Sequence, residues 1–291
     1  MNEVACVLEA GAILGETPVW CPVERRLYWV DIRRPAVHRF DPRTGETWSW
    51  GTPEDVGFVV LRQGGGAVVG LRRGFAFLDL VTGTVTKVLD PEPDRPENRL
   101  NDGKCDRRGR LWAGSVNQST PRAPTAALYR LDPNLSCQMM ERGITTSNSI
   151  AWSPDDRTFY FADTPTCQIV AYDFNPAEGT ISNRRVFATL PEGGGRPDGS
   201  TVDSEGFLWN AHFDGGRITR YAPDGRVDRV IQLPVLHPTS CAFGGDNLDV
   251  LYVTTSSHLL SDTDRSRNPL AGGLFAVHVG VRGLPEPRFA G

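Results

Sequence analysis

The sequence predicts an all-β protein that folds as a six-bladed β-propeller with four-stranded blades. One unit recurs six times at a period of about 40–50 residues, each unit carries hairpin signals, and no segment shows convincing helical periodicity. A parallel β-helix would need shorter repeats, and a β-sandwich would not repeat its whole unit six times. We therefore expect a single propeller domain over residues 1–291.

The first half of each unit is an apolar strand, a turn rich in Asp, Gly or Pro, and a second strand rich in aromatic residues. A degenerate copy, FVVLRQGGGAVVGL (58–71), fills the gap between the first two clear copies. The clear copies are PVWCPVERRLYWVD (18–31), KCDRRGRLWAG (104–114), IAWSPDDRTFYFAD (150–163), TVDSEGFLWNA (201–211) and CAFGGDNLDVLYVTT (241–255). This pattern supplies two strands of every blade.

The second half of each unit supplies the outer strands. Third strands such as FAFLDLVTGT (75–84) alternate apolar residues and run into a Gly-containing turn, which is the hairpin signal. Fourth strands follow, such as SNRRVFATL (182–190). The sixth unit lacks a clear fourth strand because the chain stops soon after LFAVHV (274–279). We expect the N-terminal segment EVACVLEAG (3–11) to supply this strand and close the ring.

Charge argues against a nucleic-acid partner. The net charge is −4 and the basic residues are scattered, whereas a nucleic-acid surface needs a basic face. Four arginine pairs are isolated, and we interpret each as a solvated hairpin tip. They are Arg33–Arg34, Arg72–Arg73, Arg107–Arg108 and Arg184–Arg185.

Cysteine usage and the N-terminus predict a cytoplasmic location. The six cysteines are spread singly with no C-x-x-C motif, which fits a reducing compartment. The N-terminus has no basic region typical of a signal peptide, and no apolar run approaches the roughly 18 residues of a membrane span. We expect a monomer without a membrane partner.

The repeat also aligns polar residues between units. Superposing the first unit on the fourth places Glu16 on Asn148, and superposing the third on the fifth places Asn101 on Asp198. Each residue lies four positions before an anchor in the first strand, which is the innermost strand of a propeller blade. Two carboxylates and two amides that converge on the axis would repel or stay unsatisfied without a cation. All-oxygen ligands suit a hard or borderline divalent ion.

A simpler alternative is that these residues only form turns, because Asp and Asn are common before strands. Their matched register in four units argues against it, and Glu16 is a poor turn former. The second and sixth units carry Gly57 and Ser240 near the same position. We expect this side of the ring to be open and to admit the substrate.

The chain resembles the gluconolactonase family, which includes regucalcin (senescence marker protein) and bacterial sugar lactonases. The motifs that carry the resemblance follow in order along nearly the whole chain. They include LGETPVW (14–20), RLNDGKCDRRGRLWAGS (99–115), SNSIAWSPD (147–155), RPDGSTVDSEGFLW (196–209) and PLAGGLFAV (269–277). The resemblance implies a six-bladed propeller that hydrolyses aldonolactones with a bound divalent metal.

Carried over motif by motif, the resemblance implies Glu16, Asn148 and Asp198 as metal ligands, with Arg99 and Asn101 contacting the substrate. The three ligands agree with positions that the repeat had already aligned. The metal itself is left open among Ca²⁺, Zn²⁺, Mn²⁺, Mg²⁺ and Fe²⁺, because carboxylate and amide oxygens accept several ions.

One stretch departs from the family pattern. Regucalcin-like members carry acidic residues shortly after the AGT/S motif, and here residues 116–119 read VNQS without an acid. We expect Asn117 or Gln118 to contact substrate hydroxyls instead. The preferred sugar therefore stays open between a pentonolactone and a hexonolactone.

The implied chemistry is hydrolysis of an ester. A metal held by three side chains keeps positions open for water and the substrate oxygen, polarises the lactone carbonyl and lowers the pKa of water. Asp198 is the candidate general base. Arg99 would bind substrate hydroxyls or the developing carboxylate, with Asn101 as a neutral hydrogen-bonding partner.

Other chemistries find less support in the sequence. There is no G-x-S-x-G elbow and no H-x-x-x-H pairing, and His212 either lines the rim of the site or is structural. The glycine runs 64–66 and 193–195 look like turns, so no nucleotide cofactor is expected. Two alternative functions stay open, namely a promiscuous esterase or organophosphatase and a non-enzymatic metal-binding propeller.

Overall fold

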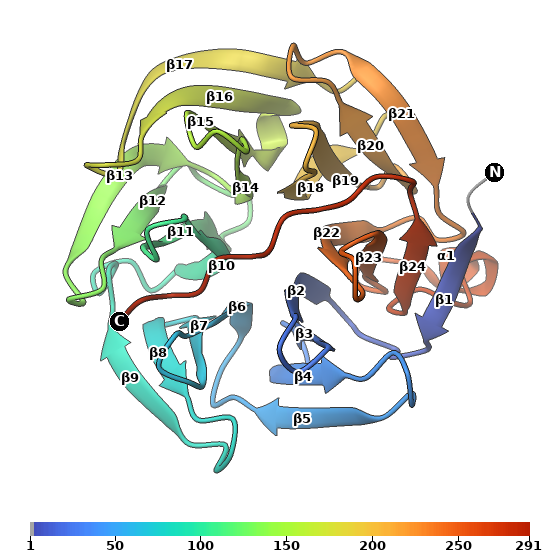
Figure 1. Ribbon diagram of the computed structural model, residues 1–291, viewed down its shortest axis with the longest axis horizontal. Helices are drawn as coiled ribbons and strands as arrows, with labels where there is room; N and C mark the ends of the chain where they lie inside the picture. Colours follow the sequence, from blue (N-terminus) through green and yellow to red (C-terminus); the bar gives the residue numbers. More distant parts are fainter. Residues whose placement is uncertain (1–2) are drawn as a thin grey trace.

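Six four-stranded antiparallel sheets surround a central axis in the computed structural model, which describes residues 3–291 (Figure 1). Within each sheet the strands are ordered outward from the axis, and neighbouring strands are joined by hairpins in five of the six. The structure confirms the predicted six-bladed propeller.

The strands divide into blades as follows. Blade 1 contains β2 (Gly15–Cys21), β3 (Arg26–Asp31), β4 (Ala36–Phe40) and β5 (Thr47–Gly51). Blade 2 contains β6 (Val56–Leu61), β7 (Ala67–Leu71), β8 (Gly74–Leu78) and β9 (Val85–Leu89). Blade 3 contains β10 (Asn98–Cys105), β11 (Leu111–Asn117), β12 (Ala126–Leu131) and β13 (Cys137–Ile144).

The second half of the chain continues this pattern. Blade 4 contains β14 (Ser147–Trp152), β15 (Thr158–Asp163), β16 (Gln168–Asn175) and β17 (Thr180–Thr189). Blade 5 contains β18 (Arg196–Val202), β19 (Leu208–Phe213), β20 (Arg217–Tyr221) and β21 (Val227–Gln232). Blade 6 contains β22 (Pro238–Gly244), β23 (Val250–Thr255), β24 (Leu274–His278) and β1 (Val4–Leu8).

The N-terminal strand closes the ring. β1 pairs antiparallel with β24 in the register Val4↔Val277 and Ala5↔Ala276, so it forms the outer edge of blade 6. This confirms the strand that the sequence predicted from residues 3–11. The first and last parts of the chain are thereby joined in one sheet.

Buried aspartates fix the hairpin turns that the repeat predicts. In blade 5, one carboxylate oxygen of Asp203 accepts hydrogen bonds from Trp209 Nε1 and Arg220 Nε, both at 2.9 Å. In blade 3, Asp106 accepts a bond from Trp112 Nε1 at 3.1 Å in the same way. The indole groups thus satisfy their polar atoms at the turn while their rings are buried between blades.

Each innermost strand carries a β-bulge near its start. Such a bulge adds residues to one strand and re-aims the side chains beside it. The register shifts lie between Glu16 and Val19, Val56 and Phe58, Leu100 and Asp102, Asn148 and Ala151, Pro197 and Ser200, and Pro238 and Ser240. All six bulges lie at the same level of the ring as the polar residues that the repeat aligned.

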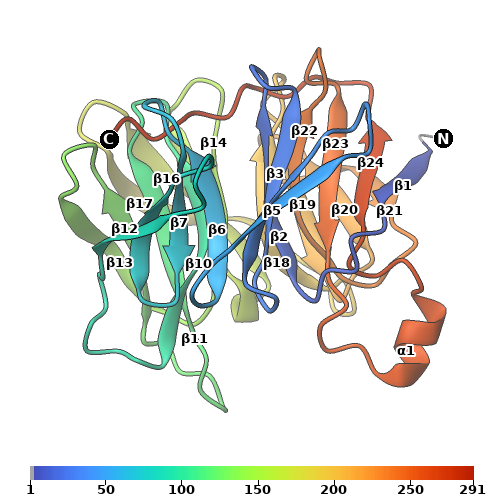
Figure 2. The same ribbon diagram turned by 90° about the horizontal axis from the view of Figure 1, so that it is seen from below.

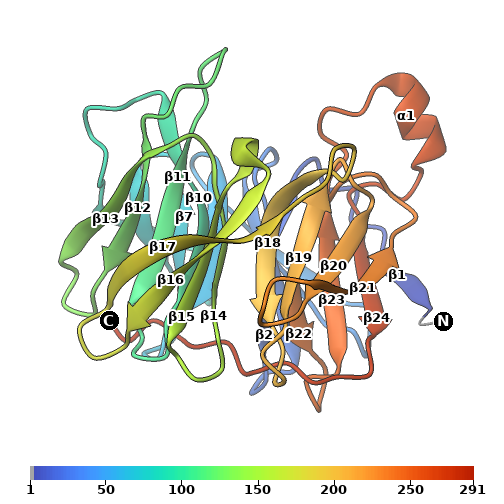
Figure 3. The same cartoon turned by 90° about the horizontal axis from the view of Figure 1, so that it is seen from above.

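Two short helices interrupt the strands. The 3₁₀ turn η1 (Thr164–Thr166) follows β15, and α1 (Asp262–Arg267) projects from one face of the ring (Figure 3). Helix α1 was not predicted, because it buries no residue and so has no apolar periodicity. The Ser261 side chain caps it by accepting a hydrogen bond from the Asp264 amide. In residues 3–291 no helix has the length and apolar character needed to cross a membrane.

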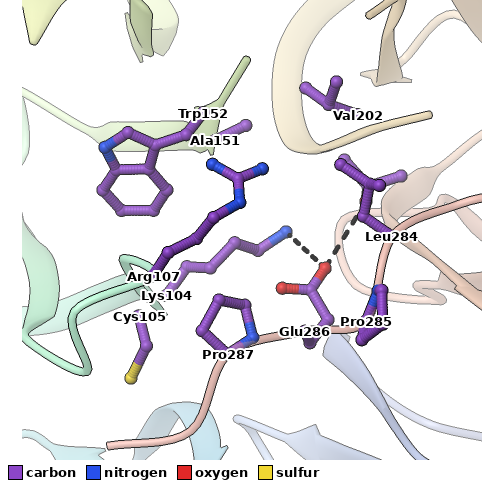
Figure 4. Close-up of a pocket in the computed structure, with 11 residues that line it drawn as sticks. Lys104, Cys105, Arg107, Ala151, Trp152, Val202, Leu284, Pro285, Glu286 and Pro287 are labelled. Atoms are coloured by element: carbon purple, nitrogen blue, oxygen red, sulfur yellow. Dashed lines mark hydrogen bonds and ion pairs between the residues drawn. The ribbon is translucent and has the colours of Figure 1, made fainter. Parts of the chain in front are cut away.

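The C-terminal tail after β24 crosses the ring on the face opposite α1 (Figures 1 and 2). Lys104 from β10 donates to Glu286 Oε1 at 3.2 Å (Figure 4) and also to the Ser200 carbonyl at 2.9 Å. Phe289 is fully buried, and its amide donates to the Leu61 carbonyl at 2.9 Å. The tail thereby covers this end of the channel, which the sequence analysis had not predicted.

Candidate active site

The starts of the innermost strands line one pocket of about 210 Å³. Glu16 from β2, Asn101 from β10, Asn148 from β14 and Asp198 from β18 all lie in its wall. The structure therefore brings together the four positions that the repeat aligned. The pocket lies at the end of the channel that the C-terminal tail does not cover.

Hydrogen bonds fix the orientation of the two amides. Asn148 Nδ2 donates to Thr164 Oγ1 at 2.8 Å, and that hydroxyl donates to the Pro197 carbonyl at 2.9 Å. Asn101 Nδ2 donates to the Ser147 carbonyl at 2.9 Å and to Asn148 Oδ1 at 3.2 Å. Both amide nitrogens are thus engaged by the protein, which leaves oxygen lone pairs available in the pocket.

The backbone beside Glu16 and Asn148 has an unusual conformation. The next residues, Thr17 and Ser149, have positive φ angles of 48° and 62°, a region that β-branched residues in particular avoid. Ser149 Oγ donates to the Asp198 carbonyl at 2.7 Å, which ties blade 4 to blade 5. Strain of this kind persists only where the surroundings impose it, and it gathers at functional sites.

Two equivalent aspartates position the loops that enter the site. Asp31 accepts hydrogen bonds from the amides of Ile13 and Leu14 at 3.0 and 3.1 Å. Asp163, its counterpart in blade 4, accepts bonds from the amides of Thr145 and Thr146. These carboxylates hold the backbone two and three residues before Glu16 and Asn148, so they position both side chains.

The carboxylates of the pocket are buried close to one another. Burial, and then the charge of Asp102, raise the pKa of Glu16 to about 8. Burial, and then the charges of Glu16 and Asp102, raise the pKa of Asp198 well above its ordinary value. Asp198 Oδ1 is buried and has no hydrogen-bond partner among residues 3–291. An unpartnered buried carboxylate oxygen among like charges is costly without a cation.

This donor set fits a divalent cation. Two carboxylates and two amide oxygens converge on one pocket, and such oxygens are the ligands that hard and borderline divalent ions prefer. Within residues 3–291 no three His, Cys, Asp or Glu side chains are grouped closely enough to hold an ion by themselves. The amide oxygen of Asn148 is therefore part of the candidate set.

Arg99 lies in the pocket wall, as predicted, and is buried. One of its guanidinium nitrogens donates to the Leu100 carbonyl at 2.9 Å, while its Nε has no partner among the described residues. Burial, and then the nearby charge of Arg33, lower its pKa to about 10. The Arg99 side chain thus lines the pocket with one buried donor left unpartnered.

Asn117 and Gln118 lie outside the pocket lining. Asn117 is fully buried and donates to Asn98 Oδ1 and Thr125 Oγ1, while its own oxygen accepts two backbone amides. The Gln118 oxygen accepts a hydrogen bond from Arg72 at 2.7 Å. Both side chains are used to shape the loop after β11, and Arg122 of that loop reaches the pocket instead.

The ring is not open beside Gly57 and Ser240, contrary to the expectation from sequence. A Cβ on Gly57 would lie 2.3 Å from the Leu100 carbonyl oxygen, so the neighbouring backbone fills this space. A Cβ on Gly199 would lie 2.1 Å from Ser240 Oγ, so blades 5 and 6 are equally close. Access to the pocket therefore follows the channel axis.

Several pocket residues escaped the sequence analysis. They are Arg33, Arg122, Arg196, Phe213 and His258. Arg33 lies at an exposed hairpin tip between β3 and β4, as interpreted from the sequence, and this tip also lines the pocket. The only signal was its place next to Asp31, the residue that holds the loop before Glu16.

His212 lies outside the pocket lining, and its side chain has a structural role. Its Nδ1 lies 2.8 Å from the Gly194 carbonyl and its Nε2 lies 3.1 Å from the Tyr221 hydroxyl. Burial lowers its pKa to about 4. The ring is therefore neutral, with Nδ1–H donating and Nε2 accepting.

Known proteins are similar to this chain in sequence and in fold. Residues 14–257 match the family model described as SMP-30/Gluconolactonase/LRE-like region. The chain is 41% identical to 6-deoxy-6-sulfogluconolactonase from Pseudomonas putida over 100% of both chains. It is 36% identical to L-arabinolactonase from Azospirillum brasilense, over 96% of this chain and 92% of that protein. A solved calcium-binding protein, regucalcin from Agrobacterium tumefaciens, has a TM-score of 0.94 at 27% identity, over 99% of this chain and 97% of that one.

Proposed function

This chain belongs to the SMP-30/gluconolactonase/LRE-like family, and on that premise we propose that it hydrolyses the ester bond of a sugar lactone. Relatives that align over more than nine-tenths of their length are named as sugar lactonases. The observation that carries the proposal is the convergence of Glu16, Asn101, Asn148 and Asp198 in one pocket. The product is the corresponding aldonic acid.

Glu16, Asn148 and Asp198 are the proposed ligands of a divalent ion. Support comes from the unpartnered Asp198 Oδ1 and from the raised pKa values of both carboxyl groups, which show how poorly the site tolerates two bare charges. When bound, such an ion supplies Lewis-acid polarisation of the ester carbonyl and a lowered pKa for water.

Asp198 is the proposed general base. Its buried Oδ1 makes no hydrogen bond within residues 3–291, and in this proposal it is the oxygen that accepts a proton from the attacking water. The water oxygen adds to the lactone carbonyl carbon as its proton passes to Asp198. The ring C–O bond then breaks, and that proton is transferred to the leaving alkoxide.

Arg99 and Asn101 are the proposed substrate contacts. The buried guanidinium of Arg99 stabilises negative charge that develops on the carbonyl oxygen and remains on the product carboxylate. Asn101 holds its nitrogen toward Asn148 and Ser147, which presents its oxygen to a substrate hydroxyl. Leu14, Val116 and Phe213 add apolar surface for the C–H faces of a sugar ring.

We also propose a cytoplasmic location. All six cysteines are free, and thiols stay reduced in the cytosol. The names of the two relatives specify different sugar lactones, one of them sulfonated.

The proposal is tested by proton release from a panel of pentono- and hexonolactones, alongside simple aryl esters and phosphotriesters as competing substrates. We expect kcat/KM for at least one sugar lactone to exceed that for every aryl ester and phosphotriester. Hydrolysis of the esters without hydrolysis of any sugar lactone would contradict the proposal.

A further inference from the structure

The pocket mouth carries more positive charge than a neutral sugar lactone requires. Four arginines line the pocket, Arg33, Arg99, Arg122 and Arg196, against the two carboxylates Glu16 and Asp198. Among the residues that line the pocket, arginines therefore outnumber carboxylates by two, whereas the whole chain has a net charge of −4. Such a concentration of one sign focuses the field on ligands of the other sign.

Two of these arginines have no acidic partner among residues 3–291. Arg122 donates to Thr146 Oγ1 at 2.9 Å and forms no ion pair, and Arg99 forms none either while leaving its buried Nε unpartnered. By contrast, Arg33 pairs with Asp55 at 3.2 Å and Arg196 pairs with Asp214. These pairs hold Arg33 and Arg196 in place from outside the pocket.

The basic side chains of the pocket lie close enough together that each makes it less favourable for the others to carry a positive charge. After burial, the charges of Arg196 and Arg33 lower the pKa of Arg122. His258, also in the lining, has its pKa lowered by burial and then by Arg33. Like charges held together without a counter-ion cost free energy, as the two carboxylates do deeper in the pocket.

Burial orders these groups along the pocket. Glu16, Asp198 and Arg99 are less than a tenth exposed and form the floor, whereas the side chains of Arg33 and Arg196 are 35% and 44% exposed and lie at the mouth. Arg122 is also exposed. A lactone whose ester group lies at the floor therefore extends its far end toward these three arginines.

We propose that the substrate is a sugar lactone that carries an anionic group, a sulfonate, phosphate or carboxylate, on the carbon farthest from the ester. Arg122 is the main recognition residue, supported by Arg33 and Arg196, and Arg99 is left for the ester end. Guanidinium groups suit this role because their donors match the oxygens of such anions in pairs. The inference rests on the proposed lactonase function.

The test compares kcat/KM for gluconolactone with that for lactones of similar size that carry a terminal phosphate, sulfonate or carboxylate. We expect at least one anionic lactone to be preferred by about 10–100-fold, the range of one or two charge-assisted hydrogen bonds, and the preference to shrink as salt is added. The three anions identify which group is recognised. A neutral lactone that matches or exceeds all three would overturn the inference.

Variants then assign the preference to a residue. Arg122→Gln should lower the ratio of anionic to neutral kcat/KM about tenfold or more, and Arg122→Lys should retain part of it. Arg226→Gln is the matched control, because Arg226 is an exposed arginine that pairs with Asp224 away from the pocket. A ratio that Arg122→Gln leaves unchanged would contradict the assignment.

Measuring the binding of product acids tests the anion site independently of the lactonase function. Calorimetry with gluconate and phosphogluconate, the acids rather than the lactones, needs no turnover. Tighter binding of phosphogluconate that is lost in Arg122→Gln supports the anion site even if no lactone is hydrolysed, an outcome that would refute only the lactonase function. If neither phosphogluconate nor the matching sulfonated and carboxylated acids bind more tightly than gluconate, the anion site is overturned whether or not lactones are hydrolysed.

Discussion

Glu16 and Asn148 occupy the same place in blades 1 and 4, which face each other across the axis (Figure 1). Each pairs with its neighbouring strand directly before a β-bulge, Glu16 with Val30 and Asn148 with Ala162. Each is also followed by a residue with positive φ. The same local geometry, found in both blades, directs an oxygen-bearing side chain into the pocket from opposite sides.

Neutralising Glu16 should stabilise the metal-free protein while impairing its metal binding. Glu16→Gln removes one of the buried like charges, so we expect the free energy of unfolding without metal to rise by about 1–3 kcal/mol at alkaline pH. Affinity for the divalent ion should fall by about 100-fold or more, because a charged ligand is lost. Denaturant unfolding and metal titration measure the two effects. Glu178→Gln, an exposed control, should change neither, and a Glu16→Gln protein that is less stable without metal would contradict the account.

Protonation of His212 should lower the free energy of unfolding as the pH falls below 6.5. Its pKa is lowered from 6.5 to about 4 in the folded protein, so between these values the unfolded chain binds a proton that the folded chain does not. Stability is therefore full above pH 6.5 and falls as the pH drops toward about 4, by up to about 3 kcal/mol. His212→Gln should flatten this part of the pH profile in denaturant unfolding, whereas His278→Gln, at the exposed last residue of β24, should keep it. If the free energy of unfolding of His212→Gln falls with pH as steeply as that of the parent protein, His212 is not the cause of the pH dependence.

Asp163 should affect metal binding indirectly, because it holds the loop that positions Asn148. Asp163→Ala removes the acceptor for the amides of Thr145 and Thr146, which should cost about 1–3 kcal/mol of stability. Because the loop before Asn148 loses its anchor, metal affinity should fall as well, and Asp163→Asn should recover part of both. Asp173→Ala, which removes an exposed acceptor, provides the control for thermal unfolding and metal titration. Full metal affinity in a folded Asp163→Ala protein would show that the anchor does not position Asn148.

The C-terminal tail should contribute to the free energy of unfolding and have no effect on kcat/KM. Phe289 is fully buried, so Phe289→Ala should cost about 3–5 kcal/mol of unfolding free energy. The pocket lies at the other end of the channel, so kcat/KM at a temperature where the variant is folded should match that of the parent. Phe289→Leu should cost less than about 1.5 kcal/mol. A large loss of kcat/KM in folded Phe289→Ala would mean that the tail influences the pocket.

The repeat made the fold and the floor of the site predictable. A propeller places equivalent positions at equal depth around its axis, so aligning Glu16 with Asn148 and Asn101 with Asp198 was enough to predict that all four meet. The strand from residues 3–11 was predictable for a similar reason, since the sixth unit lacked one strand and the N-terminus offered one.

The mouth of the pocket was not predictable because loops form it. Arg33 and Arg122 belong to connections that the repeat does not constrain, and their direction depends on contacts with neighbouring blades. Asn117 is the last residue of β11 and lies outside the pocket lining, and its hydrogen bonds to Asn98 and Thr125 depend on contacts that the sequence alone does not show. The tail crossing had no counterpart in any unit.

The most direct test of the central claim is lactone hydrolysis by metal-free protein before and after addition of Ca²⁺, Zn²⁺, Mn²⁺, Mg²⁺ or Fe²⁺. We expect at least one ion to restore proton release, and Glu16→Gln and Asp198→Asn each to lower kcat/KM by about 100-fold or more with that ion present. Equal rates with and without metal, or undiminished activity in both variants, would contradict it.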